Sequence, residues 1–269
     1  MVSFALMLLM LAGTVVGLVM GLTGAGGGIL AVPALVYSQG WTMQQAMPVA
    51  LLAVTIGAMI GAVEGFTKSL VRYRAAFLMA LAGSFPTWLG IRIAKHLSQT
   101  WLMGGFACVL LFVALRLYWQ VRTHSSDDDH KKCLAQVNRN TGRFDWNIKS
   151  ASVIASIGGL AGLSSGLLGV GGGFIIVPML RHFTNISVHG AVATSLFVIS
   201  LVGTMGVGMA VANGADLPLW SSVLFSVTTV IGTIVARKIA ARLPTKVVQS
   251  VFILLLLGVA GSMLIRVAF

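Results

Sequence analysis

The stretch that decides the fold occurs twice, as Gly21-Leu-Thr-Gly-Ala-Gly-Gly-Gly-Ile-Leu-Ala-Val-Pro-Ala-Leu35 and as Gly166-Leu-Leu-Gly-Val-Gly-Gly-Gly-Phe-Ile-Ile-Val-Pro-Met-Leu180. Nine of the fifteen aligned positions are identical, and the two copies lie 145 residues apart. The same offset pairs Leu51 with Leu196 and Arg92 with Arg237. Repetition at a fixed offset indicates that the chain consists of two related halves.

The composition places both halves in a membrane. Of the 269 residues, 57% are hydrophobic and 9% are charged, and the mean hydropathy is +0.96. A soluble domain carries about 25% charged residues. The apolar residues form runs of about 20, which is the length that crosses the hydrocarbon core of a bilayer. The sequence therefore predicts an all-α polytopic membrane protein and excludes a disordered chain or a disulfide scaffold, since Cys108 and Cys133 are its only cysteines.

Eight apolar runs are long enough to span the membrane, and two are too short. The short runs, Ile29–Tyr37 and Phe174–Leu180, would rise only about 15 Å as helices, so we expect half-spans or re-entrant segments there. The long runs cover 2–21, 44–65, 72–92, 100–121, 150–168, 188–211, 218–238 and 246–268. A polar stretch separates the halves, and the predicted units are a first transmembrane repeat at 1–121, a cytoplasmic linker at 122–149 and a second transmembrane repeat at 150–269.

The net charge of +12 reports membrane topology rather than nucleic-acid binding, because the 18 Lys and Arg residues stand at the ends of the apolar runs. If only the long runs cross the membrane, the halves are parallel, and 11 of these charges lie on one side of the membrane and 7 on the other. If the short runs also cross the membrane, the halves are inverted. Fifteen of the charges then lie on one side of the membrane, and Arg92, Lys95 and Arg266 lie on the other. The second division is the stronger bias. It predicts inverted repeats in a bacterial inner membrane, with both termini periplasmic.

The repeated motif Gly-x-x-Gly-x-Gly-Gly-Gly holds five glycines in eight residues. Each glycine costs about 1 kcal/mol relative to alanine inside a helix, so the motif predicts a break. Irregular backbone at membrane depth is tolerated where it is buried in protein or lines a cavity. Pro33 and Pro178 suit the first turn of a restarting helix, whose free N–H groups attract anions. We therefore predict one shared anion site from the backbone of Gly24, Gly26, Gly27, Gly28, Gly169, Gly171, Gly172 and Gly173.

Polar side chains complete the predicted substrate site. Thr23 stands in the first break, and Thr194 and Ser195 follow the second break, so their hydroxyls are candidate donors to an oxyanion. Arg92 and Arg237 occupy equivalent positions and suit bidentate binding of an oxyanion. Both arginines also stand at the end of an apolar run, where the simpler role of the side chain is to extend to the membrane–water interface.

Glu64 is the only glutamate and is a candidate to carry a coupling proton. The alternative is an i, i+4 ion pair with Lys68. No enzyme, cofactor or metal site is predicted. The pattern Gly162-x-Ser164-x-Gly166 resembles a nucleophile elbow, but it lies within an apolar run and lacks the strand that an elbow needs.

The glycine motifs could instead serve close helix packing. The chain would then be a structural or accessory membrane subunit without transport activity. Replacing Gly27 and Gly172 with alanine is expected to separate these readings, because a binding cradle would lose its anion while a packing seam would lose stability.

The duplicated Gly-x-x-Gly-x-Gly-Gly-Gly-x-x-x-Val-Pro resembles the sulfite exporter TauE/SafE family, also called the 4-toluene sulfonate uptake permease family. The resemblance covers both halves. Ala193-Thr194-Ser195-Leu196 matches the family pattern, whereas the first half has Pro48-Val49-Ala50-Leu51 there. The resemblance implies a secondary transporter of a small sulfur-containing oxyanion, such as sulfite or an organosulfonate. Because an inside-negative potential drives anions out, we expect an exporter. Its partners would be this anion and membrane lipid, and not nucleic acid. Whether two copies form a homodimer stays open.

Overall fold

The structure is a computed structural model and describes residues 2–24, 27–122, 147–215, 217–240 and 245–268. Within these residues the regular elements are helices. Eight are long and apolar enough to cross a membrane and two are shorter, so the predicted helix classes are confirmed. The order is α1 (Val2–Thr23), the 3-10 helix η1 (Gly27–Leu30), α2 (Ala31–Gln39), α3 (Met43–Thr67), α4 (Tyr73–His96), α5 (Gln99–Arg122), α6 (Ile148–Leu168), α7 (Gly173–Phe183), α8 (Val188–Ala212), α9 (Leu219–Ala240) and α10 (Thr245–Ala268).

The helix boundaries repeat at the offset seen in the sequence. Helix α3 covers 43–67 and α8 covers 188–212, which is a shift of 145 at both ends. Their starts are also capped alike. The Thr42 hydroxyl accepts a hydrogen bond from the Gln45 N–H at 3.3 Å, and the Ser187 hydroxyl accepts one from the Gly190 N–H at 3.2 Å. A side-chain oxygen at this position satisfies an N–H group that has no partner within the helix.

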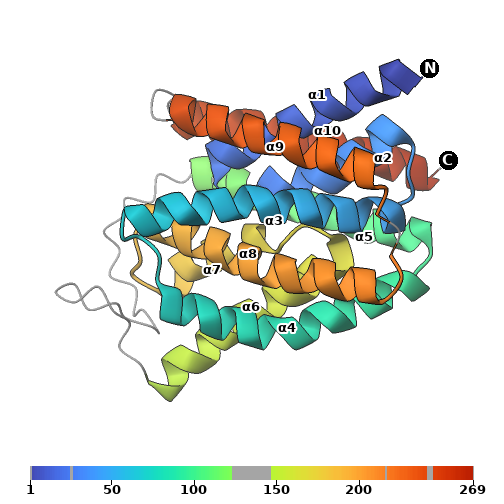
Figure 1. Cartoon of the computed structure of the whole chain (residues 1–269). Helices are drawn as coiled ribbons and strands as arrows, with labels where there is room; N and C mark the ends of the chain where they lie inside the picture. Colours follow the sequence, from blue (N-terminus) through green and yellow to red (C-terminus); the bar gives the residue numbers. More distant parts are fainter. Residues whose placement is uncertain (1, 25–26, 123–146, 216, 241–244, 269) are drawn as a thin grey trace.

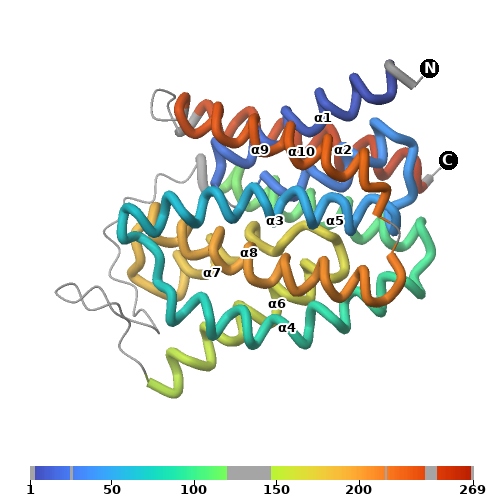
Figure 2. Tube along the Cα trace, viewed as in Figure 1, coloured from blue at the N-terminus to red at the C-terminus, as the bar shows by residue number. Residues whose placement is uncertain are grey.

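The packing of the helices also follows the repeat. Helix α1 packs on α9, and its equivalent α6 packs on α4. The central helices α3 and α8 pack on each other, as do the outer helices α5 and α10 (Figures 1 and 2). Arg72, just after the end of α3, donates its backbone N–H to Thr194 near the start of α8 at 3.1 Å, so these equivalent helices run antiparallel. Both termini lie at one end of the helical bundle, and α6 begins at the other end (Figure 1).

Glycines at every fourth position allow α1 and α9, and likewise α6 and α4, to approach closely. On α6, a Cβ built on Gly162 would lie 2.7 Å from the Cα of Gly83. On α1, a Cβ built on Gly17 would lie 2.8 Å from the carbonyl carbon of Thr229. Real Cβ atoms do not approach other atoms so closely, so only glycine fits. The sequence-based interpretation considered close packing for the glycine motifs, which begin at Gly21 and Gly166, and missed the glycines before them, Gly13, Gly17, Gly158 and Gly162.

The short segments begin earlier than expected. Gly172 has the left-handed backbone of a non-helical cap, and α7 starts directly after it at Gly173. Pro178 is therefore inside the helix and not in its first turn, so the prediction for this proline was wrong. Pro33 lies in the first turn of α2, as predicted. Most of the predicted linker at 122–149, and Gly26 of the first motif, lie outside the described residues.

Candidate functional site: a cationic cavity beside two glycine breaks

The glycine motifs end α1 and α6 by the same backbone conformation. Gly24 has a φ of +79° and its equivalent Gly169 a φ of +68°. Gly171 and Gly172 follow with φ of +77° and +69°. L-residues with a Cβ avoid this region, so glycine is required where the chain leaves the helix. The predicted breaks are thus present in both halves.

The two breaks lie next to each other in the centre of the molecule. A Cβ built on Gly28 would lie 3.3 Å from the carbonyl oxygen of Val170 in the other break. The same Cβ would lie 2.9 Å from the side chain of Val54 on α3, and a Cβ on Gly171 would lie 3.3 Å from it. Val54 is 1% exposed. The two segments therefore meet inside the protein, where irregular backbone is tolerated at membrane depth.

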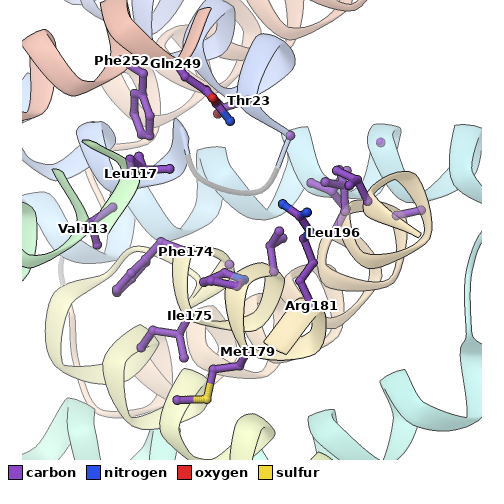
Figure 3. Close-up of a pocket in the computed structure, with 18 of the residues that line it drawn as sticks. Thr23, Val113, Leu117, Phe174, Ile175, Met179, Arg181, Leu196, Gln249 and Phe252 are labelled. Carbon is purple, nitrogen blue, oxygen red and sulfur yellow. The ribbon is translucent and has the colours of Figure 1, made fainter. Parts of the chain in front are cut away.

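A cavity of about 1250 Å³ opens beside the breaks, at the end of the bundle where α3, α7 and α9 end. Thr23 and Gly24 of the first break and Gly173 and Phe174 of the second contribute to its wall. Apolar side chains from α5 and α10 form another part of the wall, and Figure 3 shows this arrangement. The apolar residues include Val109, Phe112, Val113, Leu117 and Phe252.

Positive charge dominates the polar part of this wall. Its described lining residues include four cations, Lys68, Arg116, Arg181 and Arg237, and one carboxylate, Glu64, which is an excess of three positive charges. Histidines 182 and 189 also line it. Figure 3 shows the Arg181 side chain directed into the cavity. A concave surface of one sign concentrates ions of the opposite sign, so the cavity favours an anion.

Glu64 is held by two of these cations. Its Oε1 accepts a hydrogen bond from Lys68 Nζ at 2.6 Å, which confirms the predicted i, i+4 ion pair. Its Oε2 accepts from the guanidinium of Arg237 on α9. The Arg237 side chain is 19% exposed, and its Nε is buried without a hydrogen-bond partner among the described residues. Glu64 therefore neutralises part of the cluster, and one Arg237 donor stays unsatisfied.

The predicted substrate residues separate into two groups. Thr23, Gly24, Gly173, Arg237 and the coupling candidate Glu64 line the large cavity. The others lie elsewhere among the described residues, and Gly169 lines a smaller cavity at the other end of the bundle. The residues outside the large cavity are Gly27, Gly28, Gly169, Gly171, Gly172, Thr194, Ser195 and Arg92.

The candidate hydroxyls have local partners or are enclosed. The Thr23 hydroxyl donates to the Val19 carbonyl oxygen at 2.7 Å, within its own helix. The Thr194 hydroxyl accepts the bond from Arg72 and is buried, and the Ser195 hydroxyl is buried without a partner. An anion needs donors, and a hydroxyl has only one proton to give. The cationic side chains are therefore the main donors that face this cavity.

Arg92, the repeat equivalent of Arg237, is exposed and lies over the ring of Trp88 at 4.4 Å. The two arginines thus have different surroundings. The sequence-based interpretation missed Arg116 and Arg181 as cavity residues, because it used them only to assign topology. A signal existed for Arg116, since a charge inside the predicted span 100–121 is costly in a membrane and usually marks a functional site.

A polytopic helical protein with an internal charged cavity between two related halves belongs to the class of membrane transporters. The sulfite exporter TauE/SafE family model matches residues 9–263, so the chain belongs to this family. A "Probable membrane transporter protein" of Xylella fastidiosa (strain Temecula1) is 30% identical over 93% of this chain and 91% of its own length. A similarly described protein of Haemophilus influenzae is 25% identical over 97% and 98% of the two chains. "Probable membrane transporter protein YunE" of Bacillus subtilis is 25% identical over 74% and 76%. No solved structure matches.

Proposed function

We propose that this transporter is a secondary transporter that exports a small sulfur-containing oxyanion, such as sulfite or an organosulfonate. The anion would bind in the large cavity, beside the two glycine breaks. The observation that carries this proposal is the charge of the wall, where Lys68, Arg116, Arg181 and Arg237 face a single carboxylate among the described lining residues. The family name agrees with this substrate class.

The chemistry of the wall suits an ion that cannot lose its charge. Moving an unpaired ion into a dry medium costs tens of kcal/mol, so a membrane path for it needs paired charges and donors along its length. Arginine offers planar, bidentate donors to an oxyanion, and each hydrogen bond to a charged group contributes about 1.5 to 3 kcal/mol. The apolar residues opposite, such as Phe112 and Phe252, would contact the carbon skeleton of an organosulfonate.

The direction follows from the membrane potential. An inside-negative potential favours movement of an anion out of the cell by about 2.3 kcal/mol per charge per 100 mV. Export would then proceed without a coupling ion, whereas import would require one. Glu64, the described carboxylate of the cavity, is our candidate for a coupling proton if the flux responds to a pH gradient.

We propose that the halves, 1–121 and 150–269, are inverted in the bacterial inner membrane, with both termini periplasmic and the linker 122–149 cytoplasmic. Two observations support this arrangement. The equivalent helices α3 and α8 run antiparallel, and the termini share one end of the bundle while α6 begins at the other (Figure 1). Reporter fusions after residue 269 and within the linker test it. A cytoplasmic signal from the fusion after residue 269 would contradict it.

Transport in proteoliposomes tests the substrate and its site. Labelled sulfite, sulfoacetate and taurine are offered separately, with and without imposed pH and voltage gradients. We expect saturable flux of one of these anions and a loss of at least tenfold in kcat/KM in Arg181→Gln. Arg74→Gln is the matched control, because Arg74 is exposed and does not line the cavity. Flux of none of these anions by folded protein would refute the substrate class and favour an accessory subunit. Equal flux in both variants would refute the site.

A further inference from the structure

A second, much smaller cavity lies at the opposite end of the bundle. Its volume is about 60 Å³, which is room for a few water molecules. The start of α3 and the ends of α4, α6 and α8 surround it. Lys95 is the charged side chain among the described residues that line it. Nothing in the sequence alone pointed to this cavity.

The wall of the small cavity repeats part of the wall of the large one. Of its twelve lining residues, eight have a repeat equivalent, at the offset of 145, that lines the large cavity. These pairs place α3, α6 and α8 at the small cavity and their equivalents α8, α1 and α3 at the large one, whereas α5, α6, α7 and α10 add further walls to the large cavity. The eight pairs, small cavity first, are Gln44 and His189, Met47 and Val192, Pro48 and Ala193, Leu51 and Leu196, Gly166 and Gly21, Gly169 and Gly24, Ala210 and Gly65, and Ala215 and Leu70.

Polar contacts hold the helix ends together around the small cavity. Gln44 Nε2, at the start of α3, donates to the carbonyl oxygen of Leu97 after α4 at 3.0 Å. Lys95 Nζ, on α4, donates to the carbonyl oxygen of Asn213 at the end of α8. At the large cavity the equivalent helices α9 and α3 are joined by Arg237 and Glu64 instead, and a volume about twenty times larger is open there.

We infer that the small cavity is the other mouth of the anion path, closed in this structure, and that Lys95 is the cation that receives the anion when it opens. This inference rests on the proposed function. Two cavities that share eight equivalent positions, a large one and a small one at opposite ends, are what a transporter with inverted halves requires to expose one site to each side in turn. Opening the small cavity breaks the partly buried hydrogen bond of Gln44 and the exposed hydrogen bond of Lys95, and water can then bond to the separated groups.

Thiol labelling measures the opening of each cavity without any substrate. Cys108 and Cys133 are first replaced by serine. A single cysteine is then placed in the small cavity as Ala210→Cys or in the large cavity as Ala193→Cys, since both alanines line a cavity and are small. Lipid nanodiscs expose both faces, so the labelling rate depends on the cavity and not on the orientation of the protein.

Two further cysteines serve as controls. Ala58→Cys lies in the middle of α3, is fully buried and lines neither cavity, so labelling there reports unfolding. Thr100→Cys is exposed near the small cavity, at the start of α5, and gives the rate of an open site.

Gln44→Ala removes one closing contact and leaves Lys95 in place. We expect it to raise the labelling rate at Ala210→Cys at least tenfold and to lower the rate at Ala193→Cys, with Ala58→Cys unlabelled. In this background a sulfonate-bearing thiol reagent should react faster than a trimethylammonium reagent at Ala210→Cys, relative to their ratio at Thr100→Cys. Adding Lys95→Ala should abolish that preference.

Three results would overturn the inference. The first is an unchanged rate at Ala210→Cys in both Gln44→Ala and Gln44→Ala/Lys95→Ala. The second is a parallel rise at Ala210→Cys and Ala193→Cys, which would indicate a continuous pore or general loosening. The third is a reagent preference that survives removal of Lys95. Since the labelling requires no transported substrate, failure of the labelling with intact anion flux refutes this inference alone, and normal labelling without flux refutes the proposed substrate alone.

Discussion

Gly162→Ala tests the close packing of α6 against α4, which fixes the position of one glycine break. A Cβ on Gly162 would lie 2.7 Å from the Cα of Gly83, at least 0.7 Å short of the 3.4 Å at which ordinary contact begins, and still closer to the Gly83 carbonyl oxygen. The atoms that it meets are backbone, which cannot rotate away as a side chain can. The two helices would have to separate.

The expected magnitude follows from three contributions. Overpacking of a tight contact costs about 1 to 3 kcal/mol. The Thr87 hydroxyl of α4 shares its proton between the Gly83 carbonyl oxygen of its own helix at 2.7 Å and the Gly162 carbonyl oxygen at 3.0 Å. Separation stretches the second bond, and an interhelical bond of this kind contributes about 0.6 kcal/mol. Alanine gains about 1 kcal/mol over glycine in helix propensity. The net loss in free energy of unfolding is about 1.5 kcal/mol, roughly a tenfold change in the equilibrium constant.

Gly159→Ala is the matched control, because it lies on the same helix and its Cβ would meet nothing closer than 3.9 Å. It carries the propensity gain without the overlap, so its stability should stay unchanged or rise by up to about 1 kcal/mol. Unfolding of both variants is followed by tryptophan fluorescence in mixed micelles with increasing dodecyl sulfate. If Gly162→Ala proved as stable as Gly159→Ala, the argument that backbone contact requires glycine here would be wrong.

Three further variants test the cavity and its supports. Gly61→Ala places a Cβ 3.0 Å from the guanidinium carbon of Arg237 and 2.7 Å from Leu196 Cδ1, and both are the far ends of flexible side chains that can move aside. We therefore expect a severalfold rise in KM for the anion with a loss of less than about 1 kcal/mol in stability. Unchanged KM would show that Arg237 does not contact the anion. Glu64→Gln removes the carboxylate that pairs with cations of the cavity. The affinity for the anion should therefore rise severalfold at low ionic strength and depend more steeply on salt concentration. Titration calorimetry at two salt concentrations measures both effects. Thr87→Val removes the buried hydroxyl that bonds to Gly83 within α4 and to Gly162 on α6, and should cost about 1 kcal/mol in the same micelle assay. Unchanged stability would show that this hydroxyl contributes nothing.

The proposed exchange of Gly27 and Gly172 for alanine is less informative than the sequence suggested. A Cβ on Gly27 would lie 2.6 Å from the backbone of Val19, and one on Gly172 would lie 2.9 Å from the backbone of Ala161. Both variants would disturb packing whether or not an anion binds. The charged residues of the cavity are better test positions, because they line the cavity, whereas backbone atoms lie close against both of these glycines.

The sequence by itself determined the helices and their breaks. Apolar runs reveal spans because their length must match the hydrocarbon core, and five glycines in eight residues end a helix wherever they occur. The offset of 145 predicted two related halves, and the helix caps at Thr42 and Ser187 are found at that offset in the structure. These features are local, so they need no knowledge of the neighbouring helices.

The tertiary structure decided which residues share a cavity. Arg92 and Arg237 are equivalent in sequence, yet one lies exposed over Trp88 and the other lines the cavity with Glu64. Arg116 and Arg181 come from α5 and α7, and only folding brings them to the same wall. The surroundings of a side chain depend on helices far away in the chain, and the two halves surround their equivalent residues differently.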